Sequence, residues 1–250
     1  MSKSLPYSMK DVHYDNAKFR HRSFFKVVTQ TLFSAKGIGT NEELKEVTDV
    51  GIRDVEEKWI ARQQNVKDAF THAWSGYKKF AMGYDELMPV SQHGVDELGG
   101  IGATVVDALD TAMIMGLDEV VSEAGSWIES HLLDRINNKG QVNLFETTIR
   151  VLGGLLSAFH LSGGDQGIAL TQKGPKPAIY LNIAKNLADR LLSAFTSSPT
   201  PIPFSDVVLR DSSAHPAPDG LSSTSEVSTY SLNSIISVQF LVIQSMAQKG

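Results

Sequence analysis

Apolar residues recur at helical spacing in five successive segments of this chain, whereas the strict alternation of a strand is scarce. In the first segment, Val66, Phe70, Trp74 and Tyr77 follow one another every three or four residues, as on one face of an amphipathic helix. Glycine or proline occurs in the connections. The predicted helices cover 63–80, 103–115, 118–135, 143–161 and 180–195. Helices joined by modest loops predict an all-α fold of stacked αα-hairpins.

The composition fits a globular chain and excludes several classes of function. The chain has 250 residues, 42% hydrophobic and 20% charged, which is enough for one large core. The net charge of −5 provides no overall attraction to nucleic acid or anionic lipid, and nothing indicates a nucleotide site. Cysteine is absent, which excludes disulfides, thiol nucleophiles and cysteine-bound zinc. No apolar run is long enough to predict a transmembrane helix.

Residues 1–60 differ in character from the rest of the chain. Their first part is basic, and the acidic stretch "NEELKEVTDVGIRDVEEK" follows. Neither part has enough apolar residues for a core, so we predict a tail or linker that can include some helix. The predicted folded region therefore begins at about residue 61.

A cluster of glycines, "GGIGAT" at residues 99–104, invites comparison with a phosphate-binding loop. It lacks the Lys-Ser/Thr pair of a P-loop, and no strand is predicted before it. We interpret Gly99, Gly100 and Gly102 instead as positions where a turn passes close to a neighbouring helix.

The helix predicted over 143–161 contains two charges in an otherwise apolar segment. On a wheel that advances by about 100° per residue, Arg150, Gly153 and Ser157 fall in one narrow strip with Glu146. Leucine, isoleucine and phenylalanine cover most of the remaining surface. A strip exposed to solvent would be richer in lysine and glutamate, so this one is typical of the lining of an enclosed polar pocket.

The helix predicted over 103–115 repeats this arrangement. Thr104, Asp107, Asp110 and Thr111 share one strip, and apolar residues occupy the other faces. Two such helices can line a polar pocket together. The alternative is purely structural: Glu146 and Arg150 form an ordinary i,i+4 ion pair, and the aspartates cap or bind backbone. The pattern alone leaves both interpretations open.

Five stretches of the chain, from about Val66 to Thr229, resemble the class I alpha-1,2-mannosidases of glycoside hydrolase family 47. Their sequences are most similar to the endoplasmic-reticulum type of plants. They occur in family order and at family spacing. The stretches are "AFTHAWSGYKKFAMGYDELMPVS", "GGIGATVVDALDTAMIMGL", "VNLFETTIRVLGGLLSAFHLSG", "NLADRLLSAF" and "STSEVST". The resemblance implies part of an αα-hairpin toroid, a seven-hairpin (α/α) barrel whose inner helices surround the sugar site.

The resemblance also implies an activity and roles for four residues. Family members remove terminal alpha-1,2-linked mannose from N-glycans by inversion and require calcium. Glu146 matches the family's general acid, and Arg150 matches an arginine that contacts mannose and orients that acid. Ser205 and Glu226 match further positions in the substrate cleft. Oligomannose N-glycans on glycoproteins are then the expected partners.

The chemistry explains why a carboxyl belongs on such a helix. Inversion needs one protonated carboxyl at the leaving oxygen and a second acid that activates water on the opposite face of the sugar. Burial among apolar side chains raises the pKa of a carboxyl, which suits a proton donor, whereas a neighbouring arginine lowers it. The sequence therefore does not decide the net direction of the pKa of Glu146.

The resemblance covers about half of a family catalytic domain. The family's other catalytic acids and its calcium-binding threonine fall outside the matching stretch, so no metal site is predicted within this chain. The basic residues near the N-terminus resemble the family's cytosolic tail, but "TLFSAKGIGTNEELKE" stands where an apolar membrane anchor is expected. The family implies a location at the endoplasmic-reticulum or Golgi membrane.

Residues 230–250 depart from the family pattern, and we interpret them as a frame-shifted tail. A set of codons exists for residues 229–249 that, read in the neighbouring frame, encodes "LQLEFNYLSAVSGDPKYGTE", an amphipathic continuation of family type. The predicted organisation is thus a tail or linker at 1–60, half of a barrel at 61–229 and an aberrant tail at 230–250.

Three functions follow from the incomplete match. The first is a mannosidase by family whose isolated chain is inactive. The second is a non-catalytic fragment that binds oligomannose. The third is a product without function, because half of a closed barrel exposes the apolar flanks of its edge helices.

Overall fold

The computed structural model describes the backbone of residues 41–164 and 167–228, with side chains from residue 58 onward. The chain divides into two units, Met1–Ile60 and Ala61–Gly250, which are considered separately. Within the described ranges, no helix combines the length and the apolar character needed to cross a membrane. The predicted tail over 230–250 and most of the predicted N-terminal tail lie outside the described residues.

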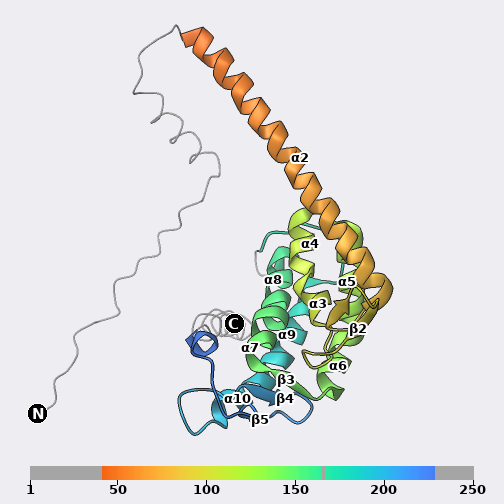
Figure 1. The fold of residues 1–250 in the computed structure, drawn as a ribbon, viewed down its shortest axis with the longest axis vertical. Helices are drawn as coiled ribbons and strands as arrows, with labels where there is room; N and C mark the ends of the chain where they lie inside the picture. The colour runs from red at the N-terminus through yellow and green to blue at the C-terminus, as the bar shows by residue number, and fades with distance from the viewer. Residues whose placement is uncertain (1–40, 165–166, 229–250) are drawn as a thin grey trace, which may run out of the picture. The chain divides into compact units, whose positions relative to one another are not determined.

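The five predicted helical regions are all present, which confirms the all-α assignment (Figure 1). Four of them are composed of two or three successive segments, and the fifth, 63–80, lies within a single helix. The helices are α2 (Asn41–Ala81), α3 (Ala103–Asp107), α4 (Leu109–Met115), α5 (Asp118–Trp127), η1 (Ile128–Leu132), α6 (Leu133–Asn138), α7 (Leu144–Glu146), η2 (Thr147–Leu152), α8 (Gly153–Leu161), α9 (Pro177–Leu191) and α10 (Ser193–Thr196).

Within the described residues, five strands of three residues each accompany the helices, and the sequence analysis did not predict them. β1 (Glu86–Met88) and β2 (His93–Val95) form an antiparallel hairpin. β3 (Gln141–Asn143), β4 (Asp206–Val208) and β5 (Ser213–His215) form an antiparallel sheet in that order. Figure 1 shows this sheet beside α7. The sheet joins the region around residue 206 to the start of the helix that carries Glu146.

The core of the Ala61–Gly250 unit is helical. α4 packs against α5, α8 packs against α9, and α3 packs along η2. The close approach of α8 to α3 requires a glycine, because a Cβ at Gly154 would lie 3.0 Å from the backbone oxygen of Val106. Burying large side chains between such helices is the main stabilising contribution to the fold. Those that are almost completely buried include Ile101, Leu109, Ile128, Leu132, Leu155, Tyr180 and Leu187.

The glycine cluster forms a turn around a buried carboxylate. Asp85, which is fully buried, accepts hydrogen bonds from the backbone N–H groups of Leu98, Gly100, Gly102 and Ala103 at 2.7–3.0 Å. A Cβ at Gly102 would lie 2.3 Å from the Trp127 ring of α5. The N–H groups that would bind a phosphate are therefore occupied within the protein, and the turn passes close to a neighbouring helix as predicted.

Candidate active site around Glu146

The helix that carries Glu146 is continuous from Leu144 to Leu161 through α7, η2 and α8. It begins because Asn143, in extended conformation, accepts a hydrogen bond from the backbone N–H of Glu146 at 2.9 Å through its side-chain oxygen. The π-helical segment η2 follows Glu146 directly and contains Arg150. Segments of π-helix inside α-helices are rare and occur frequently at functional sites.

Arg150 bridges two carboxylates from different helices. Its Nε donates to Glu146 Oε2 at 2.5 Å, and its Nη1 donates to Asp107 Oδ2 on α3 at 3.1 Å. The two acidic strips predicted on separate helices therefore meet at one arginine. An isolated i,i+4 pair would not involve α3, so the ordinary surface pair is an incomplete description of this cluster.

The three side chains of this cluster are neither buried nor fully exposed. The exposed fractions are 30% for Glu146, 42% for Arg150 and 46% for Asp107. Hydrogen bonding to Glu146 raises the pKa of Arg150, with a further contribution from Asp107, whereas partial burial opposes the rise. Arg150 is thus held as a cation between the two carboxylates.

Several polar atoms of the cluster are available to a ligand. Among the described residues, Glu146 Oε1 and Arg150 Nη2 make no hydrogen bond. On the other sides of the helix, Thr147, Val151 and Leu152 are buried. The helix thus presents one carboxyl oxygen and one guanidinium nitrogen next to an apolar core. This arrangement can bind a hydroxyl and, when the carboxyl is protonated, can donate that proton to an ether oxygen.

The predicted strip on the second helix divides in the structure. Of its four residues, Asp107 is the one that forms an ion pair with Arg150 in the described part of the chain. Thr104 donates to the backbone oxygen of Asp85 at 2.5 Å, toward the glycine turn. Asp110 is half-buried, and Thr111 donates to its carboxylate at 3.4 Å. These contacts link Asp107 to Arg150 and show no such link for the other three residues, so a pocket lined by both strips stays a prediction.

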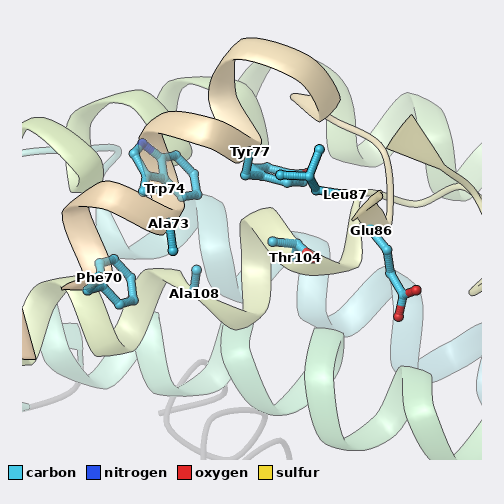
Figure 2. A pocket seen from close by; sticks show the side chains of 8 residues that line it. All are labelled: Phe70, Ala73, Trp74, Tyr77, Glu86, Leu87, Thr104 and Ala108. Carbon is cyan, nitrogen blue, oxygen red and sulfur yellow. The ribbon is translucent and has the colours of Figure 1, made fainter. Parts of the chain in front are cut away.

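A cavity of about 360 Å³ lies between α2, β1 and α3 (Figure 2). Its walls are mainly aromatic and aliphatic, and neither Glu146 nor Arg150 lines it. The cavity is therefore distinct from the polar cluster. The lining residues are Phe70, Ala73, Trp74, Tyr77, Glu86, Leu87, Thr104 and Ala108.

Ser205 lies next to the start of the Glu146 helix. Its backbone oxygen accepts a hydrogen bond from the N–H of Leu144 at 2.7 Å. Its Oγ is buried and makes no hydrogen bond to any described residue. The strand pairing of β3 with β4 thus brings Ser205 to Leu144, two residues before Glu146.

Glu226 belongs to a short helical turn at residues 224–228 and is half-buried. Its backbone N–H is 3.4 Å from Ser223 Oγ. No hydrogen bond or ion pair joins its side chain to Glu146 or Arg150 in the described part of the chain. The role predicted for Glu226 in the substrate cleft stays a prediction.

The described residues contain no group of three or more His, Cys, Asp or Glu side chains arranged to hold a metal ion. Calcium prefers six to eight oxygen ligands. The cluster around Arg150 does not fit this requirement, because a guanidinium already lies between its two carboxylates.

Two residues near Glu146 were missed by the sequence analysis. Asn143 precedes Glu146 by three residues, and this Asn-x-x-Glu spacing before an apolar run is a recognisable N-cap signal. Asp206 lies opposite Asn143 in the sheet. No local pattern identifies Asp206, because its position depends on the pairing of strands that are three residues long.

Comparison with known proteins places these features in a family. The sequence model described as glycosyl hydrolase family 47 matches residues 69–235. The chain is 57% identical to the mannosyl-oligosaccharide 1,2-alpha-mannosidase MNS3 of Arabidopsis thaliana over 300 positions, covering 93% of this chain and 48% of the relative. It is 45% identical to the endoplasmic reticulum mannosyl-oligosaccharide 1,2-alpha-mannosidase of Homo sapiens, covering 62% of this chain and 20% of the relative.

Among solved structures, the chain is similar to the alpha-1,2-mannosidase from Trichoderma reesei. The TM-score is 0.55 and the identity 33%, over 63% of this chain and 32% of that one. The chain thus spans about half, or less, of the length of the relatives that it matches. The family match covers most of the helical unit and includes the Glu146–Arg150 helix, so the chain belongs to glycosyl hydrolase family 47.

Proposed function

We propose that this chain contributes the acid-bearing half of an alpha-1,2-mannosidase site that trims terminal alpha-1,2-linked mannose from oligomannose N-glycans by inversion. Glu146 donates the proton to the leaving oxygen. Arg150 holds the Glu146 carboxyl in place and contacts the sugar, and Ser205 and Glu226 belong to the substrate cleft. The relatives named as mannosyl-oligosaccharide 1,2-alpha-mannosidases support this substrate class.

The observation that carries the proposal is the bridge of Arg150 between Glu146 and Asp107. It fixes Glu146 Oε2 and leaves Oε1 without a partner among the described residues. A general acid needs this combination of a fixed orientation and one free oxygen. The half-exposed position gives a substrate access to that oxygen.

A second acid must come from outside this cluster. In an inverting glycosidase the two carboxyl groups are roughly 6.5–9.5 Å apart, with room for a sugar and a water between them. Arg150 fills the space between Glu146 and Asp107. Asp107 is therefore unsuited to activate water for Glu146, and turnover requires the part of the relatives that this chain does not span.

We include calcium in this proposal only because the family requires it. The described residues do not form a site for it, so none of the steps assigned here to Glu146 and Arg150 involves the ion. We further propose that the protein acts at the membrane of the endoplasmic reticulum or Golgi, which the names of the mammalian relatives support for the endoplasmic reticulum.

For the isolated chain, we propose binding of oligomannose without turnover. The donor and acceptor atoms around Glu146 and Arg150 are available within this half, whereas the water-activating acid is not. This candidate differs from the catalytic proposal in one measurable respect, since it predicts retention of glycan without release of free mannose.

The test is a fusion of residues 61–229 to the remaining catalytic part of the Arabidopsis relative. We expect the fusion to release mannose from an oligomannose glycan. Glu146→Gln should lower kcat by about 10²- to 10⁴-fold, the usual contribution of a general acid. Glu97→Gln, in an exposed loop, is the matched control and should leave kcat unchanged. Full activity of the Glu146→Gln fusion would refute the assignment of the acid.

A further inference from the structure

Asp206 carries a mostly buried carboxyl group that has no hydrogen-bond or ion-pair partner among the described residues. Only 8% of its surface is exposed, and no hydrogen bond or ion pair to its side chain is present in the described part of the chain. Among the described residues, the side-chain atoms that have neither solvent contact nor a hydrogen-bond partner are Tyr180 Oη and Ser205 Oγ. The oxygens of Asp206 are not among them, so they still reach the surface. A mostly buried carboxyl ordinarily has a hydrogen-bond donor, so a ligand can supply the missing one.

The strand register places Asp206 beside the start of the Glu146 helix. Asp206 of β4 is directly opposite Asn143 of β3. The flanking positions make the ladder hydrogen bonds, from Leu144 N–H to Ser205 O and from Leu209 N–H to Gly140 O. Asn143 and Asp206 are therefore a non-hydrogen-bonded pair, in which Cα atoms are only about 4.5 Å apart and side chains share one face.

The two side chains offer complementary hydrogen-bonding groups. The Oδ1 of Asn143 is occupied by the backbone N–H of Glu146, and its Nδ2 makes no hydrogen bond among the described residues. An amide nitrogen donates, and a carboxylate accepts. A sugar hydroxyl does both, so one hydroxyl can accept from Asn143 and donate to Asp206.

We infer that Asn143 and Asp206 form a subsite that binds a hydroxyl of a mannose unit next to the bond that Glu146 protonates. The inference rests on the proposed function and names a specificity contact within it. Asn143 connects this subsite to Glu146, because its side chain caps the helix at Glu146 and its position in β3 is directly opposite Asp206.

A structural role for Asp206 makes a different prediction. A carboxylate near the N-terminus of the helix Leu144–Leu161 can stabilise it through the helix dipole without touching a ligand. In that case Asp206→Asn would lower the melting temperature and leave sugar binding unchanged once the protein is folded. The subsite predicts the opposite pattern.

The experiment titrates the isotope-labelled 250-residue chain with alpha-1,2-mannobiose and follows backbone amide signals by NMR. We expect the signals of Asn143 and Asp206 to shift in the wild type. Asp206→Asn should weaken mannobiose binding by about tenfold or more, the usual consequence of losing a charged hydrogen bond, with the melting temperature retained. Asp211→Asn, an exposed carboxyl in the β4–β5 turn, is the control and should bind as the wild type does.

The outcomes separate this inference from the proposed function. Equal affinity of Asp206→Asn and wild type, or mannobiose shifts that avoid Asn143 and Asp206, would overturn the subsite. Absence of mannobiose binding would overturn it too, whereas the catalytic proposal would still stand if the fusion shows turnover that depends on Glu146. If Asp206→Asn does not fold, the signal shifts in the wild type decide alone.

Discussion

Asp85 and Glu146, two carboxylates of the Ala61–Gly250 unit, differ in their burial and in how many of their oxygens are hydrogen-bonded. Asp85 is fully buried, and its two oxygens accept four backbone hydrogen bonds. Glu146 is 30% exposed and binds Arg150 through Oε2, while its Oε1 has no partner among the described residues. A carboxylate whose acceptors are all satisfied can only stabilise the fold, whereas one with a free oxygen can also bind a ligand or transfer a proton.

The surroundings of the two groups reinforce this difference. The turn around Asp85 is also held by Arg135, which donates to the backbone oxygens of Gly83 and Gly100 at 3.1 and 3.0 Å. The cluster around Glu146 consists of half-exposed ion pairs, which typically contribute little to stability. We therefore expect substitutions near Asp85 to affect folding and substitutions near Glu146 to affect function.

The largest effect on stability is expected from Asp85→Ala. It leaves four buried or partly buried N–H groups without an acceptor, and a single unsatisfied group already costs about 1–3 kcal/mol. We expect the free energy of unfolding to fall by roughly 3–5 kcal/mol, as for other broken buried charge networks. Urea denaturation of Asp85→Ala beside Glu97→Ala, an exposed control, measures this loss. Equal stability of the two variants would contradict the structural role of Asp85.

The next effect is expected from Gly102→Ala in the same turn. Its φ is 75°, and the new Cβ would lie 2.3 Å from the Trp127 ring. Backbone strain and overpacking together should lower the free energy of unfolding by about 2–4 kcal/mol. Gly116→Ala separates the two contributions, because Gly116 has a φ of 69° but no atom within 4 Å of the added Cβ. It should lose only the strain, about 1–2 kcal/mol, in the same denaturation assay.

The sequence predicted the helices and the Glu146–Arg150 pair for the same physical reason. Both depend on the helical repeat, which relates residues three or four positions apart, and that repeat persists over many residues. The helical repeat also placed Asp107 on a polar strip. It did not predict the contact of Asp107 with Arg150, because that contact requires two helices to pack at a particular register.

What the sequence did not predict depends on distant pairing. The carboxylate of Asp85 accepts hydrogen bonds from N–H groups 13 to 18 positions later in the chain. No local sequence pattern predicts these hydrogen bonds. Strands of three residues are too short for alternation to be recognised, so the sheet that joins Asp206 to Asn143 was missed. The π-helical turn after Glu146 likewise has no sequence signal in a segment that continues as α-helix.

A smaller effect on stability is expected from Glu146→Gln in the isolated chain. The glutamine keeps the shape and can still accept from Arg150, and the exposed pair contributes at most about 1 kcal/mol. We expect a loss below this limit in urea denaturation, together with no mannose release by either wild type or variant. Turnover by the wild-type chain that disappears in Glu146→Gln would show that this half of the site suffices for catalysis. A loss of several kcal/mol would place Glu146 with Asp85 as a structural carboxylate.

The smallest effect on stability is expected from substituting Glu123, a third carboxylate. It is partly exposed, as Glu146 is, but both of its oxygens accept hydrogen bonds, as those of Asp85 do. Burial raises its pKa, but hydrogen bonds from Lys78 and from Trp74, the latter at 2.9 Å, outweigh burial and lower the pKa below its ordinary value. A carboxyl whose pKa is lower in the folded state stabilises the protein above the unfolded pKa of about 4.3, and this contribution disappears as the pH falls through the folded value.

Glu123→Gln should therefore lower the free energy of unfolding at pH 7 by a few tenths of a kcal/mol, because Glu123 and Lys78 are 33% and 53% exposed. The difference from wild type should shrink as the pH falls through the lowered folded pKa of Glu123, because the carboxyl then takes up a proton in the folded state as well. Urea denaturation at pH 7, 5 and 3 measures it, with Glu119→Gln, an exposed residue of the same helix, as the control. A difference that grew as the pH fell would mean that burial of Glu123, and not its hydrogen bonds to α2, sets its charge.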